Sequence, residues 1–75
     1  MDIHIEYCIK WNYKPKFDRV SELILKLHPN AKISENKSYP RSGAFEVTVN
    51  GKLVYSKFQT GDFPNLKIIK EWFNA

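Results

Sequence analysis

A predicted strand gives way to a predicted helix within the stretch Tyr7-Cys8-Ile9-Lys10-Trp11-Asn12-Tyr13-Lys14-Pro15-Lys16-Phe17. This stretch holds the only cysteine of the chain, three of its lysines and four of its aromatic residues. Cys8 is the one side chain here with obvious nucleophilic chemistry, since a thiolate attacks disulfides and other electrophiles. If the protein performs covalent chemistry, we expect Cys8 to perform it.

The pattern of apolar residues on either side of this stretch predicts the two elements. Residues 2–7 alternate between polar and apolar side chains, which is typical of a strand. Its apolar face consists of Ile3, Ile5 and Tyr7. Beyond Pro15, which suits the first turn of a helix, apolar residues recur at three- and four-residue steps. They are Phe17, Val20, Leu23, Ile24 and Leu27. We expect this helix to end by His28, because Pro29 follows.

The remainder of the chain contains three more strand-like segments and a second helix. The strands are expected at 31–36, 45–49 and 53–58. Asn50-Gly51 predicts a hairpin between the last two strands, because both residues tolerate a positive φ. Asp62 is expected to cap the final helix, with Pro64 in its first turn. The core-facing residues of that helix are expected to be Leu66, Ile69 and Phe73.

The predicted element order is β-α-β-β-β-α, within a single domain that spans residues 1–75. The first three elements make a βαβ unit, whose crossover is right-handed and whose strands are parallel. The whole predicts an α/β (α+β) two-layer sandwich, with a mixed four-stranded sheet and two helices that cover its apolar face. This is the minimal layout of a thioredoxin-like fold. That fold keeps its reactive thiol between the first strand and the first helix, where Cys8 lies.

Composition narrows the class of protein. A chain of 75 residues with 43% hydrophobic content is one small globular domain and not a disordered segment. No apolar run approaches a membrane span, and the N-terminus lacks the pattern of a secretory signal, so we expect a soluble cytoplasmic protein. One cysteine cannot form an internal disulfide. The net charge of +4 is mild and scattered, so that it would suit a nucleic-acid or acidic partner but decides little between function classes.

Five motifs follow one another along nearly the whole chain. They are Tyr7-Cys8, Asn12-Tyr13-Lys14-Pro15-Lys16-Phe17, Pro40-x-x-Gly43-Ala44-Phe45-Glu46-Val47, Asn50-Gly51-Lys52-Leu53-Val54-Tyr55-Ser56-Lys57, and Gly61-Asp62-Phe63-Pro64. In this order they resemble the selenoprotein W branch of the Rdx (SelT/SelW/SelH) family. The resemblance implies a thioredoxin-like fold and a thiol or selenol redox role that is linked to glutathione.

The chain departs from that family at one decisive position. Relatives carry Cys-x-x-Cys or Cys-x-x-selenocysteine, whereas Trp11 stands three residues after Cys8 here. An internal dithiol–disulfide cycle needs two sulfurs within bonding reach, so this chain cannot perform one. A monothiol cycle is left, in which Cys8 attacks a disulfide such as oxidised glutathione and an external thiol resolves the mixed disulfide.

Cys8 is the candidate catalytic residue. The following helix presents the positive end of its dipole to the loop, and nearby lysines add positive charge. No acid lies between Cys8 and Asp18 to oppose them, so these features favour the thiolate form. The alternative is that Cys8 is an inert remnant of an ancestral motif, half buried at the end of the strand.

The candidate binding residues are Trp11, Tyr13, Lys14, Lys16, Pro40 and Arg41. Trp11 could cover the thiol, stack on a ligand or contact a protein partner, and otherwise it packs at the sheet edge. The three basic residues could bind the carboxylates of glutathione, and otherwise they are solvated. Tyr13 is expected to be mainly structural, and Pro40 is expected to be a turn proline near the site. No metal is expected, because neither histidine has ligand spacing with Cys8, and glutathione is expected as a co-substrate and not as a bound cofactor.

Two functions of different classes follow. The first is a monothiol redox protein of selenoprotein W type, whose partner is glutathione or a protein thiol or disulfide. The second is a non-catalytic thioredoxin-like module that binds a protein through the 8–16 loop, because an aromatic residue has replaced the second sulfur. Nucleic-acid binding is disfavoured, since the lysines are spread over several predicted elements.

Overall fold

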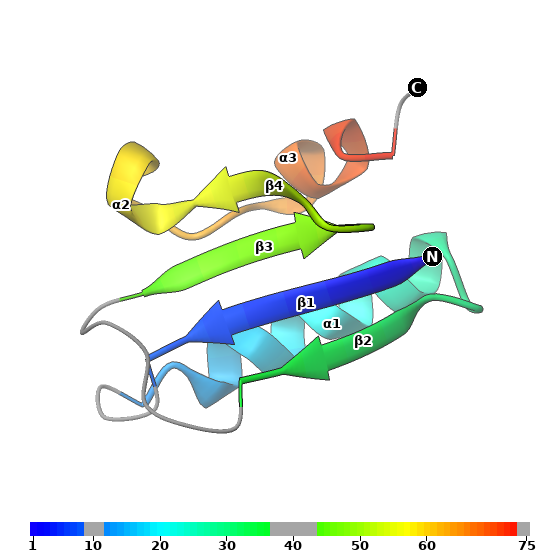
Figure 1. Ribbon diagram of the computed structural model, residues 1–75, viewed down its shortest axis with the longest axis horizontal. Coiled ribbons are helices and arrows are strands. Elements are labelled where there is room, and N and C mark those ends of the chain that lie inside the picture. The colour runs from blue at the N-terminus through cyan, green and yellow to red at the C-terminus, as the bar shows by residue number, and fades with distance from the viewer. Residues whose placement is uncertain (9–11, 37–43, 74–75) are drawn as a thin grey trace.

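The computed structural model describes residues 1–8, 12–36 and 44–73, and it shows a mixed four-stranded sheet with helices on one face (Figure 1). The strands are β1 (Asp2–Tyr7), β2 (Lys32–Glu35), β3 (Phe45–Val49) and β4 (Lys52–Ser56). The helices are α1 (Lys14–Leu27), α2 (Lys57–Thr60) and α3 (Leu66–Glu71). Every helix in the described ranges is too short or too polar to cross a membrane.

The sheet is built around β1. The strand order is β2-β1-β3-β4, with β1 parallel to β2 and antiparallel to β3, and with β3 and β4 joined as a hairpin. The parallel pair requires a crossover, which α1 supplies. The mixed sheet, the βαβ unit and the thioredoxin-like arrangement predicted from the sequence are therefore confirmed.

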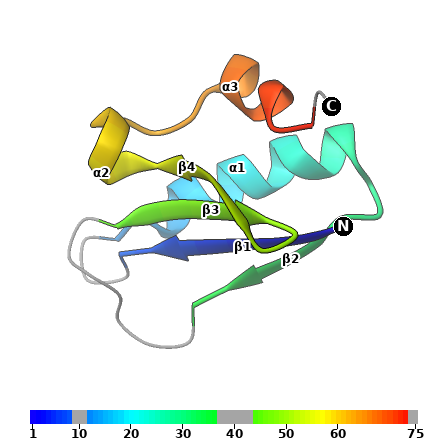
Figure 2. The ribbon, with the colours of Figure 1, turned by 45° about the horizontal axis from the view of Figure 1, so that its top comes forward.

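The core lies between one face of the sheet and the helices α1 and α3, which cover that face together (Figure 2). The buried strand residues include Ile3, Ile5, Tyr7, Phe45, Val47 and Tyr55. The buried helix residues are Phe17, Val20, Leu23, Ile24 and Ile69. The alternation predicted for residues 2–7 and the apolar stripe predicted for the first helix both face this core. Leu66, which was expected to face it as well, is instead 42% exposed.

The local signals at α1 and at the β3–β4 turn act as predicted. Pro15 lies in the first turn of α1, and the helix ends at Leu27, where the His28 backbone N–H still donates to Ile24. Asn50 and Gly51 adopt positive φ values of 51° and 84°, which close a two-residue turn. Asn50 also holds the first strand, because its backbone N–H donates to the carbonyl oxygen of Asp2 at 2.7 Å and its Oδ1 accepts from the N–H of Asp2 at 2.9 Å.

The chain after β3 differs from the prediction in its element boundaries. The predicted strand 53–58 ends at Ser56 and is followed by the short helix α2, so the structure adds a third helix to the two expected. The Glu46 carboxylate explains this ending, because it accepts from the Ser56 hydroxyl at 2.6 Å and from the Lys57 backbone N–H at 3.0 Å. Because its backbone N–H is bonded to the Glu46 carboxylate, Lys57 starts a helical turn and does not extend the strand. Gly61, at φ 78°, ends that turn.

The cap of the final helix also differs from the prediction. Asn65 caps α3, with its Oδ1 accepting from the Ile68 backbone N–H at 2.9 Å. Asp62 instead accepts from the N–H of the next residue, Phe63, at 2.8 Å. Pro64 is buried ahead of the helix and is not part of its first turn. The predicted turn at 39–43 lies outside the described residues.

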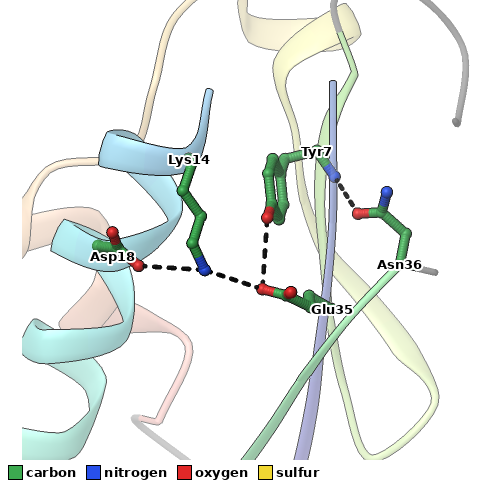
Figure 3. Close-up of polar contacts among 5 residues, drawn as sticks. All are labelled: Tyr7, Lys14, Asp18, Glu35 and Asn36. Carbon is green, nitrogen blue, oxygen red and sulfur yellow. Dashed lines mark hydrogen bonds and ion pairs between the residues drawn. The ribbon is translucent and has the colours of Figure 1, made fainter. Parts of the chain in front are cut away.

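A polar network joins β1, β2 and α1 at the end of the sheet where β1 leads toward α1 (Figure 3). Glu35 Oε2 accepts from the Tyr7 hydroxyl at 3.3 Å and from Lys14 Nζ at 3.2 Å. Lys14 Nζ also lies 3.5 Å from the Asp18 carboxylate, one helical turn further on. The Tyr7 backbone N–H donates to the Asn36 side chain at 3.0 Å. The network thus holds β2 to β1 and α1 at this end, through contacts of Glu35 with residues 28 and 21 positions earlier in the sequence.

The network shifts the ionisation of two of its members. Burial raises the pKa of the Tyr7 hydroxyl, and the neighbouring Glu35 carboxylate raises it further because it disfavours a second negative charge. The hydrogen bond to Glu35 raises the pKa of the Lys14 ammonium. Both groups are therefore held in their protonated forms in the folded protein.

We expect a large loss of stability when Ile24 is truncated to alanine. Ile24 is 0% exposed, and removing a buried aliphatic side chain leaves a cavity and costs about 2–5 kcal/mol. The neighbouring substitution Leu25→Ala is a matched control, because Leu25 is 42% exposed and should lose well under about 1 kcal/mol. Urea unfolding monitored by circular dichroism measures both. Equal losses in the two variants would contradict the packing described for α1.

We also expect stability to fall as the pH rises above about 10, the ordinary pKa of tyrosine. Tyr7 and Lys14 have raised pKa values in the folded state, so the unfolded chain releases these protons first and stability declines with rising pH. Urea unfolding between pH 8 and pH 11 measures this decline. The variant Tyr7→Phe should show a shallower decline, and a decline as steep as that of the parent would argue against a role for Tyr7.

Candidate functional site

Cys8 lies directly after β1, at the junction that the sequence predicted. Its backbone is held on both sides, because its N–H donates to the Ala44 carbonyl at 2.9 Å and its carbonyl accepts from the Tyr13 N–H at 3.2 Å. The first bond continues the pairing of β1 with β3 by one step. The second draws the residue before α1 back toward the end of β1. Cys8 therefore sits at a fixed point between strand and helix.

The thiol itself is a free, buried group. Cys8 is only 1% exposed, which is more buried than the half-buried position considered from the sequence. A disulfide substrate cannot reach a sulfur in this position unless the surrounding chain opens. The structure thus places Cys8 between β1 and α1, as expected from the sequence, with its side chain buried.

Lys14 is engaged within the protein. Its ammonium contacts Glu35 at 3.2 Å and Asp18 at 3.5 Å, and it lies 4.6 Å above the ring of Phe17. The hydrogen bond to Glu35 that raises its pKa also directs it toward β2. This geometry assigns Lys14 to the network that anchors α1. Its predicted role in binding a carboxylate ligand would require it to leave that network.

Tyr13 and Lys16 belong to a second cluster, which two residues missed by the sequence reasoning complete. Tyr13 packs edge-to-face on Phe63, with ring centroids 4.9 Å apart, and Phe63 packs in turn on Phe45 at 5.3 Å. Lys16 Nζ lies 5.2 Å from the Phe63 ring, and Lys57 Nζ lies 5.5 Å from the same ring and 5.7 Å from that of Tyr13. We call Tyr13, Lys16, Lys57 and Phe63 the lysine–aromatic cluster.

The lysine–aromatic cluster borders Cys8 through the backbone. Tyr13 donates its N–H to the Cys8 carbonyl, and Phe63 rests on Phe45, next to the Ala44 carbonyl that Cys8 contacts. In both ribbon views the end of β1, the start of α1 and the helix α2 lie at one end of the molecule (Figures 1 and 2). Both residues stand in motifs quoted from the sequence, Phe63 in Gly61–Pro64 and Lys57 at the end of Asn50–Lys57, but Lys57 was assigned to a predicted strand and not to the site.

The other predicted site residues cannot be placed. Trp11, Pro40 and Arg41 lie outside the described residues, so their roles stay predictions. His4 Nδ1 pairs with the Ser34 hydroxyl at 2.9 Å on the exposed face of the sheet. In the described part of the chain, no three His, Cys, Asp or Glu side chains converge as a metal site requires.

Comparison with known proteins gives consistent matches. The model of the Rdx family matches residues 2–74. Over 69 residues the chain is 30% identical to migration and invasion enhancer 1 of Mus musculus, covering 92% of this chain and 58% of that protein. Over 61 residues it is 39% identical to selenoprotein W of Danio rerio, covering 80% of this chain and 70% of that protein. The chain thus spans little more than half the length of the first of these relatives.

Solved structures share the fold. A selenoprotein W-related protein from Vibrio cholerae superposes with a TM-score of 0.76 at 24% identity, covering 93% of this chain and 88% of that one. A Bordetella parapertussis protein superposes with a TM-score of 0.81 at 19% identity, covering 93% and 89%. At these identities the likeness speaks for the fold alone. The family model spans almost the whole chain, and so the protein belongs to the Rdx family.

Proposed function

We propose that this protein is a monothiol redox protein that exchanges disulfides through Cys8. The observation that carries the proposal is the position of Cys8, a free thiol held at the junction of β1 and the loop before α1. Membership of the Rdx family and the similarity to selenoprotein W support a redox-related role for a thiol at this point. The single sulfur restricts the chemistry to exchange with external thiols.

The exchange has two balanced steps. The Cys8 thiolate attacks one sulfur of a substrate disulfide, so that a bond from Cys8 Sγ forms and the substrate S–S bond breaks. The departing thiolate takes a proton from solvent. An external thiolate then attacks the sulfur attached to Cys8, which releases a new disulfide and regenerates the Cys8 thiolate. The net reaction exchanges one external disulfide for another, and no electrons stay on the protein.

Glutathione is the external thiol that fits this cycle, and a protein thiol or disulfide is the other class of partner. In the cytoplasm, reduced glutathione keeps thiols in their reduced form. We propose the cytoplasm as the compartment of this protein, because its only cysteine is unpaired. The protein supplies the nucleophile and binds no cofactor in this mechanism.

The burial of Cys8 adds one requirement to the mechanism. Because Cys8 is only 1% exposed, its sulfur reacts only in the fraction of molecules in which its surroundings have opened. Two openings are conceivable. Local opening at the Cys8 junction leaves the rest of the fold intact, whereas global unfolding exposes every buried group. A redox protein must use the first, because the second destroys any binding site around the thiol.

Burial also favours a second candidate function, a protein-binding module without redox chemistry. In that case Cys8 is a small apolar residue of the core, and the surface around residues 8–16 contacts a protein partner. The two candidates differ in whether Cys8 becomes accessible in the folded protein, which can be measured directly.

We expect native protein to form a glutathione adduct at Cys8 when it is incubated with oxidised glutathione. Intact-mass spectrometry should show one added glutathionyl group that dithiothreitol removes, and the variant Cys8→Ala should show none. If unfolded protein forms the adduct and native protein never does, the redox proposal fails and the binding-module proposal is favoured.

The urea dependence of alkylation distinguishes the two modes of opening. We expect iodoacetamide to modify Cys8 at least about tenfold more slowly in native than in unfolded protein, because of its burial. Below the unfolding transition, a rate that is almost independent of urea indicates local opening, since little surface is exposed. If the alkylation rate instead rises with urea as steeply as the equilibrium for global unfolding does, the redox proposal is contradicted.

A further inference from the structure

The lysine–aromatic cluster places two ammonium groups over one aromatic ring. Lys16 comes from α1 and Lys57 from α2, 41 positions apart in the sequence, and both lie within 5.5 Å of the Phe63 ring centroid. Both distances are measured to the same ring centroid. The separation of the two nitrogens therefore cannot exceed the sum of the two distances. Each ammonium group gains a cation–π interaction with that ring.

These two ammonium groups have no carboxylate partner in the described part of the chain, where the ion pairs are made by Lys14 and Arg19. Two acids adjoin the cluster through backbone groups. Glu46 accepts from the Lys57 N–H at 3.0 Å, and Asp62 accepts from the Phe63 N–H at 2.8 Å. The two ammonium groups beside one ring carry the same charge, and an anion bound next to both would relieve their repulsion.

The surroundings of the cluster suit a small ligand. Tyr13, Phe63 and Lys57 are half-buried, so the rings offer an apolar floor and the ammonium groups form a charged rim. The cluster also borders Cys8 through the backbone, because the Tyr13 N–H donates to the Cys8 carbonyl at 3.2 Å. A ligand that carries carboxylates close to a sulfur atom could place the carboxylates on the rim and the sulfur toward Cys8.

We infer that the lysine–aromatic cluster is a carboxylate-binding site in which Lys16 and Lys57 select anionic disulfides and thiols as exchange partners of Cys8. This inference deepens the proposed function and rests on it for the exchange step, whereas the binding step can be measured without any reaction of Cys8. It assigns the carboxylate contacts to Lys16 and Lys57, and it leaves Lys14 with Glu35 and Asp18 in the network that anchors α1.

The binding test uses S-methylglutathione, which carries two carboxylates and whose sulfur cannot exchange. In an NMR titration at low ionic strength, we expect the amide signals of Tyr13 and Phe63 to shift on binding. The double variant Lys16→Gln/Lys57→Gln should bind about fivefold more weakly, since each exposed ion pair contributes little. The matched control Lys67→Gln/Lys70→Gln removes the same charge from exposed positions on α3 and should bind like the parent.

Two further comparisons test the charge argument. Asp62→Asn removes an acid beside Phe63 while keeping an oxygen that can accept from its N–H, so it should strengthen binding by about twofold. The second comparison uses the dimethyl ester of S-methylglutathione. Its affinity for the parent should be no higher than the affinity of the free acid for the double variant. The inference is wrong if the double variant and the α3 control bind S-methylglutathione equally, or if the ester binds as well as the acid.

The reactive test separates this inference from the proposed function. The rate of mixed-disulfide formation at Cys8 is measured with oxidised glutathione and with neutral hydroxyethyl disulfide. We expect the double variant to slow the first reaction about fivefold and to leave the second unchanged. If neither disulfide reacts with native protein, the proposed function fails, and the S-methylglutathione titration still decides whether the carboxylate site exists. Equal slowing of both reactions would overturn the selective role of the two lysines.

Discussion

The pairing of β1 on both of its edges is the interaction on which the rest of the structure depends. β1 bonds to β2 in parallel and to β3 in antiparallel fashion, and its Ile3, Ile5 and Tyr7 form the middle of the core. A parallel partner requires α1 as a crossover, and α1 in turn provides the apolar stripe that covers those residues. Cys8 inherits its position from this arrangement, because it continues β1 by one residue and bonds to Ala44 as the ladder ends.

At that end of the sheet the structure separates anchoring from potential binding. Lys14, Glu35 and Tyr7 tie α1 to the strands through contacts of 3.2 and 3.3 Å, and the raised pKa values of Tyr7 and Lys14 reflect this arrangement. Lys16, two residues further along the helix, turns instead toward Phe63. Helical geometry explains the difference, since residues two apart point to different sides of a helix. Neighbouring lysines of one motif therefore make different contacts, Lys14 with Glu35 and Lys16 with Phe63.

The burial of Cys8 affects what the absence of a second redox cysteine means for the chemistry of this protein. In a dithiol protein a neighbouring sulfur resolves the mixed disulfide within the molecule, whereas in the proposed exchange a disulfide must first reach Cys8 and an external thiol must then resolve the mixed disulfide. Access to a sulfur that is 1% exposed is then the controlling variable of any exchange. The same burial would suit an inert core residue. The presence of the thiol therefore does not distinguish a redox protein from a binding module on this fold. The mode by which the structure opens around Cys8 does.

The sequence by itself determined β1, α1, the Asn50-Gly51 turn and the junction that carries Cys8, because apolar periodicity and allowed backbone angles act within a few residues. Only the tertiary structure decided that α2 replaces the end of a strand, because that depends on the carboxylate of Glu46 reaching Ser56 and Lys57 from the neighbouring strand. It also decided that Lys14 is engaged by Glu35, 21 residues away, and that Lys57 joins Lys16 over Phe63. The burial of Cys8 was likewise decided only by the tertiary structure. Contacts between remote segments depend on how the whole chain packs, and they produce no periodic pattern in the sequence.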